Sequence, residues 1–169
     1  VSAGGSGAVA LAGTGGNGTG YNHGVVVDGL GTRVRSAHGP LSITGTGQGA
    51  GAGNVGIFVS AGAEVAAMAS GTVTLNGAGG SGTSDGYGLA GIGLAHNGAL
   101  PTIITTGSPT AGQIKVETTG ASGGALALDY GYYSQPLNLA TIAGGDWWLG
   151  NSTQADAYYF NPALGANAN

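Results

Sequence analysis

Apolar and polar residues alternate over residues 71–80, a stretch that opens and closes with glycine. Val73 and Leu75 alternate with three polar residues, and this period of two is typical of a β-strand with one buried face. Glycines follow the strand, as expected for a turn. Similar phrases, each beginning at a glycine, recur at residues 7–15, 39–47, 112–120 and 145–150. The first three phrases begin at Gly7, Gly39 and Gly71, and this even spacing predicts a repeat architecture.

Two more short strand patterns lie between these phrases. The first is a glycine followed by apolar residues, and it occurs at residues 24–28, 56–60, 91–95 and 131–134. The second has one apolar residue between polar or small residues at residues 32–36 and 63–67, and residues 102–105 take its place in the next repeat. The first pattern begins equally far before the long phrase in two successive repeats, so their registers agree. The sequence therefore predicts three strands in each repeat of roughly 32 residues.

Parallel stacking of equivalent strands is the arrangement that buries these short patterns. Hairpins need tight turns between neighbouring strands, whereas equivalent strands here are a full repeat apart. We therefore expect an all-β fold, a parallel β-helix (β-solenoid), with right-handed coiling from the usual crossover rule. A four-stranded propeller blade fits the spacing less well. Stacking predicts two buried columns: Val9, Leu41, Val73 and Ile114 in one, and Leu11, Ile43, Leu75 and Val116 in the other.

An amide or carboxylate residue stands two residues before the glycine of several first strands. Asn and Asp accept a left-handed backbone and bond their own turn, so a stacked corner is the expected role. A row of calcium ligands is the alternative, but the spacing of calcium-binding nonapeptide repeats is approached only once, at residues 79–85. The corner residues are Asn22, Asn54 and Asp129.

Composition narrows the class of protein. The chain has 169 residues, of which 39 are glycine and 6% are charged, but an apolar share of 41% at alternating positions argues against Gly-rich disorder. There is no cysteine, so disulfides and thiolate metal sites are excluded.

The only cationic side chains, apart from histidine, are those of Arg33, Arg35 and Lys115, which makes nucleic acid a poor partner. No run of 18 apolar residues predicts a membrane span. Because the sequence begins without Met, we expect a processed or excised chain.

No constellation of side chains predicts catalysis, a cofactor or a metal site. Hydrolysis of a polysaccharide needs two carboxylates close together. The best local cluster is Asp28 with Arg33 and Arg35, near His38, and alternation places both arginines on a solvated outer face. We therefore expect no enzyme activity. Three histidines fall at different points of the repeat, which argues against a metal site: His23, His38 and His96.

A flat array of threonines on the outer face of the long strands is typical of ice binding on some β-solenoids. The outward positions read Ser42 and Thr44 in one repeat, and Thr72 and Thr74 in the next. The following long strand has a lysine and a glutamate at its outward positions. Two repeats are too few for a regular array, which argues against ice binding.

The chain from residue 129 to residue 169 differs from the repeats in residues 1–128. It holds eight of the eleven aromatic residues and has an irregular spacing. Trp147 and Trp148 are adjacent, so on a strand they face opposite sides, and a cap for the last coil accounts for only one of them. Aromatic side chains with little charge are typical of the core of an interface. The predicted interface residues are Trp147, Trp148, Tyr158, Tyr159, Phe160 and Pro162.

The recurring phrases Gly-x-Val-x-Leu-x-Gly-x-Gly and Gly-Val-Val-Val-Asp-Gly resemble the Gly/Thr/Asn-rich strand repeats of large secreted bacterial exoproteins, such as filamentous-haemagglutinin and autotransporter-passenger β-helices. The resemblance covers about residues 5–128 and implies an extracellular or cell-surface rod, adhesin or fibre without catalytic residues. We expect a structural protein that assembles with itself or with neighbouring coils of a longer parent chain. The alternative is an adhesin or carbohydrate-binding module that stacks glycans on the aromatic C-terminal segment.

Overall fold

A computed structural model gives the architecture of the chain. Within the residues it describes, it contains fourteen β-strands and no helix. The all-β prediction is therefore confirmed for this part of the chain. The structure describes residues 1–51, 53–81, 91–94, 103–106, 114–119, 126–128, 147–151 and 154–160.

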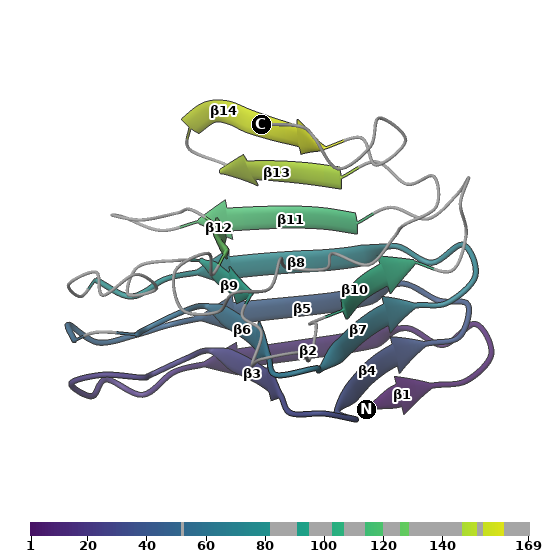
Figure 1. Ribbon diagram of the computed structural model, residues 1–169, viewed down its shortest axis with the longest axis horizontal. Helices are drawn as coiled ribbons and strands as arrows, with labels where there is room; N and C mark the ends of the chain where they lie inside the picture. The colour runs from purple at the N-terminus through teal and green to yellow at the C-terminus, as the bar shows by residue number, and fades with distance from the viewer. Residues whose placement is uncertain are drawn as a thin grey trace.

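Three sheets contain all of these strands (Figure 1). The long sheet has the order β14-β13-β11-β8-β5-β2, the β3 sheet has the order β12-β9-β6-β3, and the β4 sheet has the order β1-β4-β7-β10. The long sheet contains β2 (Val9–Thr14), β5 (Leu41–Thr46), β8 (Val73–Ala78), β11 (Ile114–Thr119), β13 (Trp147–Asn151) and β14 (Gln154–Phe160). The β3 sheet contains β3 (Val25–Asp28), β6 (Ile57–Ser60), β9 (Ile92–Leu94) and β12 (Leu126–Leu128). The β4 sheet contains β1 (Ser2–Ala3), β4 (Arg33–Ser36), β7 (Glu64–Ala67) and β10 (Ile103–Thr106).

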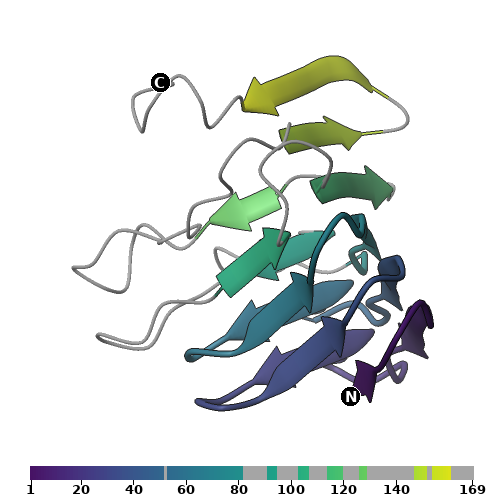
Figure 2. The same ribbon diagram turned by 90° about the vertical axis from the view of Figure 1, so that its right-hand side faces the viewer.

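Each repeat contributes one strand to each sheet. The chain runs from β3 to β4 to β5, and the same succession recurs as β6-β7-β8 and as β9-β10-β11. Equivalent strands of successive repeats are parallel neighbours, and Figure 2 shows them one above the other. Parallel neighbours need a crossover connection, and here the strands of the other two sheets supply it. The three strands per repeat that the sequence predicts are therefore present.

The register of the long sheet aligns the predicted columns. Val9 lies opposite Leu41, Leu41 opposite Val73, and Val73 opposite Ile114. The second column aligns Leu11, Ile43, Leu75 and Val116 in the same way. In β5 and β8 the column residues are fully buried, with 0% exposure, because the strand alternation turns them toward the other two sheets. The side chains of β11 lie outside the description.

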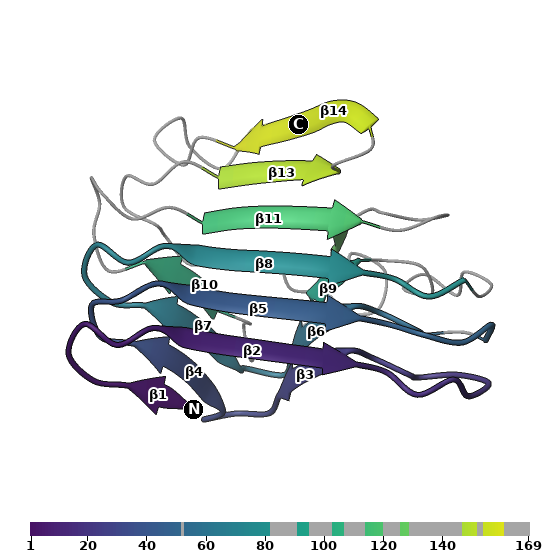
Figure 3. The same ribbon diagram turned by 180° about the vertical axis from the view of Figure 1, so that it is seen from behind.

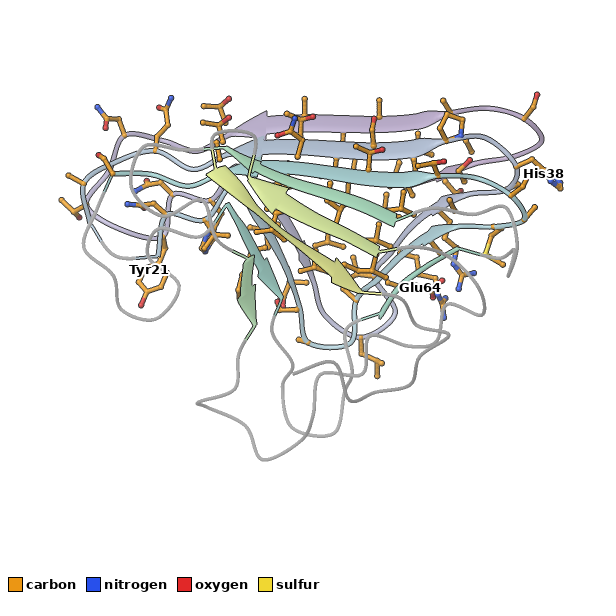
Figure 4. All side chains as sticks on the ribbon, turned by 90° about the horizontal axis from the view of Figure 1, so that it is seen from above. Tyr21, His38 and Glu64 are labelled. Atoms are coloured by element: carbon orange, nitrogen blue, oxygen red, sulfur yellow. The ribbon has the colours of Figure 1, made fainter. Side chains whose placement is uncertain are left out.

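The other two sheets complete one hydrophobic core. Val27 and Val59 point inward from the β3 sheet, and Val34, Val65 and Ile104 point inward from the β4 sheet. All five are at most 4% exposed. The core is therefore a continuous apolar interior between three sheets, and Figure 4, a view from above, shows the β3 and β4 sheets converging away from the long sheet.

Glycine near the end of each long strand lets the chain pack closely against the β3 sheet. A Cβ atom at Gly45 would lie 2.1 Å from the carbonyl oxygen of Gly56, and one at Gly77 would lie 2.1 Å from that of Gly91. Real Cβ atoms do not approach an oxygen so closely, so only glycine fits at these positions. The glycine that recurs inside the long phrase is therefore a packing requirement, not a sign of disorder.

The fourth repeat differs from the prediction in its first strand. The sequence pattern placed this strand at residues 131–134, which lie outside the described residues. The structure instead pairs Leu126 with Ile92 and Leu128 with Leu94 in β12. The prediction was wrong because the two alternating leucines match the apolar positions of β9, and the tyrosines at 132 and 133 do not.

The C-terminal strands end the parallel order of the long sheet. β13 pairs in parallel with β11, which places Trp147 opposite Ile114 and continues the long phrase. β14 then pairs with β13 in the antiparallel direction, with an irregular register between Leu149 and Asn151. Figure 3 shows β14 as the last strand of this sheet, at the end opposite to β2. The antiparallel β14 therefore ends the parallel order of this sheet after β13.

Candidate functional site

The predicted corner residues Asn22 and Asn54 bond directly across the stack. The side-chain oxygen of Asn54 accepts hydrogen bonds from the backbone N–H of Asn22 at 2.9 Å and from its side-chain amide at 3.1 Å. The amide of Asn54 donates to the carbonyl oxygen of Gly51 at 2.7 Å. These contacts use the polar atoms of Asn54 within the protein, which supports the structural role of the corner. Asp129 and the calcium-like stretch after Ser81 lie outside the description.

The two arginines bond to Glu64 and not to Asp28. Arg35 donates two hydrogen bonds to the carboxylate of Glu64, at 2.7 and 2.6 Å, and Arg33 lies 3.4 Å from the same carboxylate. Asp28 lies on the β3 sheet, where its carboxylate accepts a hydrogen bond from the hydroxyl of Ser60. The sequence suggested that Asp28 clusters with the two arginines, and this is wrong, because successive strands of one repeat belong to different sheets.

The electrostatics of this ion pair follow from its geometry. The hydrogen bond from Arg35 is the main cause that lowers the pKa of Glu64, and burial opposes it. The same hydrogen bond raises the pKa of Arg35. The carboxylate form of Glu64 is therefore favoured and is paired with the two arginines, so this side chain is poorly suited to donate a proton as a catalytic acid.

The two histidines that the structure describes, His23 and His38, do not come together. His38 is exposed in the turn between β4 and β5, and Figure 4 shows it projecting away from the protein, apart from Glu64. His23 lies before β3 on a different side of the molecule, and His96 is outside the described residues. In the part of the chain that the structure describes, no three His, Asp or Glu side chains gather as a metal site would require.

The outer face of the long sheet carries small, uncharged residues in β2, β5 and β8. Its rows across these strands are Ala10, Ser42 and Thr74; Ala12, Thr44 and Asn76; and Thr14, Thr46 and Ala78. Thr72 precedes β8, opposite Pro40, so it does not extend these rows as the sequence suggested. The rows mix alanine, serine, threonine and asparagine, so they form no regular threonine array.

Three rings gather beside the β3 sheet, where the sequence analysis expected no site. The rings of His23 and Phe58 are stacked, with centroids 5.1 Å apart and planes 10° apart. Tyr21 meets His23 edge to face at 6.3 Å. The offset of one repeat places Phe58 beside Val26, shortly after His23, and this is the signal that could have found the group.

The N-terminal end of the stack consists of three edge strands. β2 and β3 end the long sheet and the β3 sheet, and β1 ends the β4 sheet. These strands contain neither lysine nor proline, and Asp28 is their only charged residue. Edge strands without such residues are the usual template for pairing with a further strand.

The predicted interface residues of the C-terminal segment are placed only through their backbone. The register of the hairpin aligns Trp147 with Phe160 and Trp148 with Tyr159, and Tyr158 lies opposite Leu149. Their side chains and Pro162 lie outside the description, so the interface role stays a prediction.

None of the described segments forms a helix that could cross a lipid bilayer. Comparisons of the chain with protein-family models, with curated proteins and with solved structures find no match.

Proposed function

We propose that this chain is a segment of a right-handed parallel β-helix that serves as a structural rod outside the cell or on its surface. The rod grows when the N-terminal end of the stack receives a further coil from another copy of the chain. The extracellular setting rests on the resemblance of the repeats to secreted exoproteins. The parallel order of the strands and the usual right-handed crossover support the β-helix.

The incomplete burial of the first coil carries this proposal. Leu11 lies opposite Ile43 in the register, and Val25 lies opposite Ile57. Ile43 and Ile57 are 0% exposed, whereas Leu11 and Val25 are only partly buried. Apolar side chains of the interior thus reach water at this end of the described stack. Burying them against another coil would be favourable, at about 25 cal/mol per Å² of apolar surface.

Unpaired backbone groups at the same end support the proposal. β2 and β3 each offer one row of N–H and C=O groups to a further strand. Solenoids normally need a polar capping repeat to stay soluble as single units, and the described first coil has none. The hairpin of β13 and β14 makes the opposite end different. A head-to-tail joint would therefore pair β2 with β14 in the antiparallel direction.

The test is the concentration dependence of the full chain, measured by light scattering after gel filtration and by electron microscopy. We expect rods that lengthen with concentration. Leu11→Lys places a charge at the open end of the core and should abolish elongation. Thr44→Lys is the matched control, because it adds the same charge to the outward face of β5, a strand that is paired on both sides, and should leave elongation intact. A chain that stays monomeric at every concentration, or a Leu11→Lys variant that still elongates, would contradict end-to-end growth.

A further inference from the structure

The three rings beside the β3 sheet form a continuous group. His23 lies between the other two rings, stacked on Phe58 and in edge contact with Tyr21. Phe58 points outward from β6, opposite the exposed Val26 of β3. A Cβ atom at Gly93 of β9 would lie 3.0 Å from the ring of Phe58, so this ring extends over a position that has no side chain. The ring of Phe58 therefore lies over the outer faces of β6 and β9, whereas Val26 of β3 stays exposed.

Tyr21 is held in an unusual backbone conformation. Its φ angle is +55°, in the left-handed region that bulky residues rarely adopt. Its ring packs against Gly53, where a Cβ atom would lie 2.8 Å from the ring. The residue is nevertheless 74% exposed, and Figure 4 shows its ring pointing away from the long sheet. Backbone strain that presents an exposed aromatic ring is typical of a binding site and has no evident role in the core.

Polar groups border the rings on the same face. Asp28 and Ser60 follow Val26 and Phe58 by two residues in their strands, so they point outward as well. The carboxylate of Asp28 is exposed and accepts a hydrogen bond from Ser60 through one oxygen. The second oxygen provides a further acceptor. The distance along the strand from residue 23 to residue 28 is about 16 Å, enough for several sugar units.

His23 adds a donor to this surface. Its Nδ1 atom accepts a hydrogen bond from the backbone N–H of Val55 at 3.3 Å. Burial lowers the pKa of His23, so the ring is neutral at pH 7 and carries its proton on Nε2. The hydroxyl of Tyr21 can donate and accept.

We propose that the surface formed by Tyr21, His23, Val26, Phe58 and Asp28 binds a neutral oligosaccharide. A pyranose ring has an apolar face of C–H groups, which suits an aromatic ring, and hydroxyls at its rim, which suit the carboxylate and the tyrosine. The surface contains one carboxylate and no cation. An acidic or sulfated glycan would therefore meet repulsion, and both described arginines lie on the other short sheet, bonded to Glu64.

The decisive experiment is a glycan array of neutral, uronic-acid and sulfated oligosaccharides, probed with the full chain. Affinities for the neutral hexasaccharides that bind are then measured by calorimetry. Tyr21→Asn removes the ring, and asparagine tolerates the left-handed backbone, so the fold should be kept. We expect this variant to bind about tenfold more weakly, which corresponds to about 1.4 kcal/mol. Leu30→Asn is the matched control, because Leu30 is also 74% exposed but lies in the turn after β3.

Several results would overturn the site. Binding of acidic or sulfated glycans alone would show that charge recognition, and not stacking, operates. If no glycan binds, the proposal is wrong, and the rings are better explained as a contact surface for another protein. Equal loss in Tyr21→Asn and Leu30→Asn would show that general surface apolarity is responsible. Phe58→Leu keeps the apolar volume but removes the ring plane, so unchanged binding in this variant would also contradict stacking. None of these outcomes bears on end-to-end growth.

Discussion

Asn54 holds Asn22, its equivalent one repeat earlier, through two hydrogen bonds to a single side-chain oxygen. Asn54 is 0% exposed, so water cannot replace these bonds. This link joins two long connections between the long sheet and the β3 sheet, where no strand pairing holds the chain. The corner is therefore fixed by this side-chain link together with backbone hydrogen bonds between repeats, such as those from the N–H of Gly24 to the carbonyl oxygen of Val55 at 3.0 Å and from the N–H of Gly80 to that of Asn54 at 2.8 Å.

Asn54→Ala should lower the free energy of unfolding by about 1–3 kcal/mol, because it removes a fully buried side chain and leaves the partly buried N–H group of Asn22 without its acceptor. Asn22→Ala should cost less, since the backbone N–H of Asn22 remains and still donates to the side-chain oxygen of Asn54. Urea denaturation of the two variants measures the difference. Equal losses of unfolding free energy in the two variants would mean that the hydrogen bonds between Asn22 and Asn54 are not the source of the stability.

Leu75→Ala should lower the free energy of unfolding by about 2–5 kcal/mol, because the side chain is fully buried and leaves a cavity. Leu11→Ala in the same column should cost clearly less, since Leu11 lies at the open end and is partly buried. Thermal denaturation under dilute conditions, where copies do not associate, compares the two. If Leu11→Ala costs as much as Leu75→Ala, the first coil is covered and the open end does not exist.

Gly77→Ala should lower stability by about 1–3 kcal/mol or more, because the added methyl group would overlap the backbone oxygen of Gly91. Gly4→Ala is the control, since nothing lies within 4 Å of the new Cβ atom there. Its effect should be close to zero. Circular dichroism measures the denaturation midpoints of both variants. An unchanged midpoint for Gly77→Ala would mean that Gly77 lies further from the backbone of Gly91 than the structure shows.

The ion pair of Glu64 should make stability depend on acid pH. The folded pKa of Glu64 lies below the ordinary value of 4.5 because of its bonds to Arg35. The stabilisation is therefore fully present above pH 4.5 and is lost as the pH falls through the lowered pKa. Arg35 is partly exposed, so the effect should stay below about 1 kcal/mol.

Glu64→Gln isolates this contribution from those of the other carboxylates. The difference in unfolding free energy between the wild-type chain and this variant should be constant near neutral pH and shrink toward zero in acid. A difference that does not change with pH would show that the pair is not coupled to folding.

Spacing along the chain was sufficient to find the repeating strands. Parallel stacking pairs equivalent residues, so a shared offset from Gly7, Gly39 and Gly71 translates directly into the column of Val9, Leu41 and Val73. The link between Asn22 and Asn54 could be predicted for the same reason, since these two residues are one repeat apart. Alternation then decides which residues of each strand face the core, since successive side chains point to opposite faces.

Contacts between residues that are not equivalent depend on the tertiary structure. Glu64 bonds diagonally to Arg35, 29 residues away, and the stacking of His23 on Phe58 joins a loop to a strand of the next repeat. Neither pair shares an offset in the repeat, so periodicity does not predict the contact itself, although the register that places Phe58 beside Val26 brings it near His23. The reversal of β14 likewise follows from how its edge pairs with β13. Sequence periodicity determines which strands are equivalent, whereas the turns between sheets decide which outward side chains become neighbours.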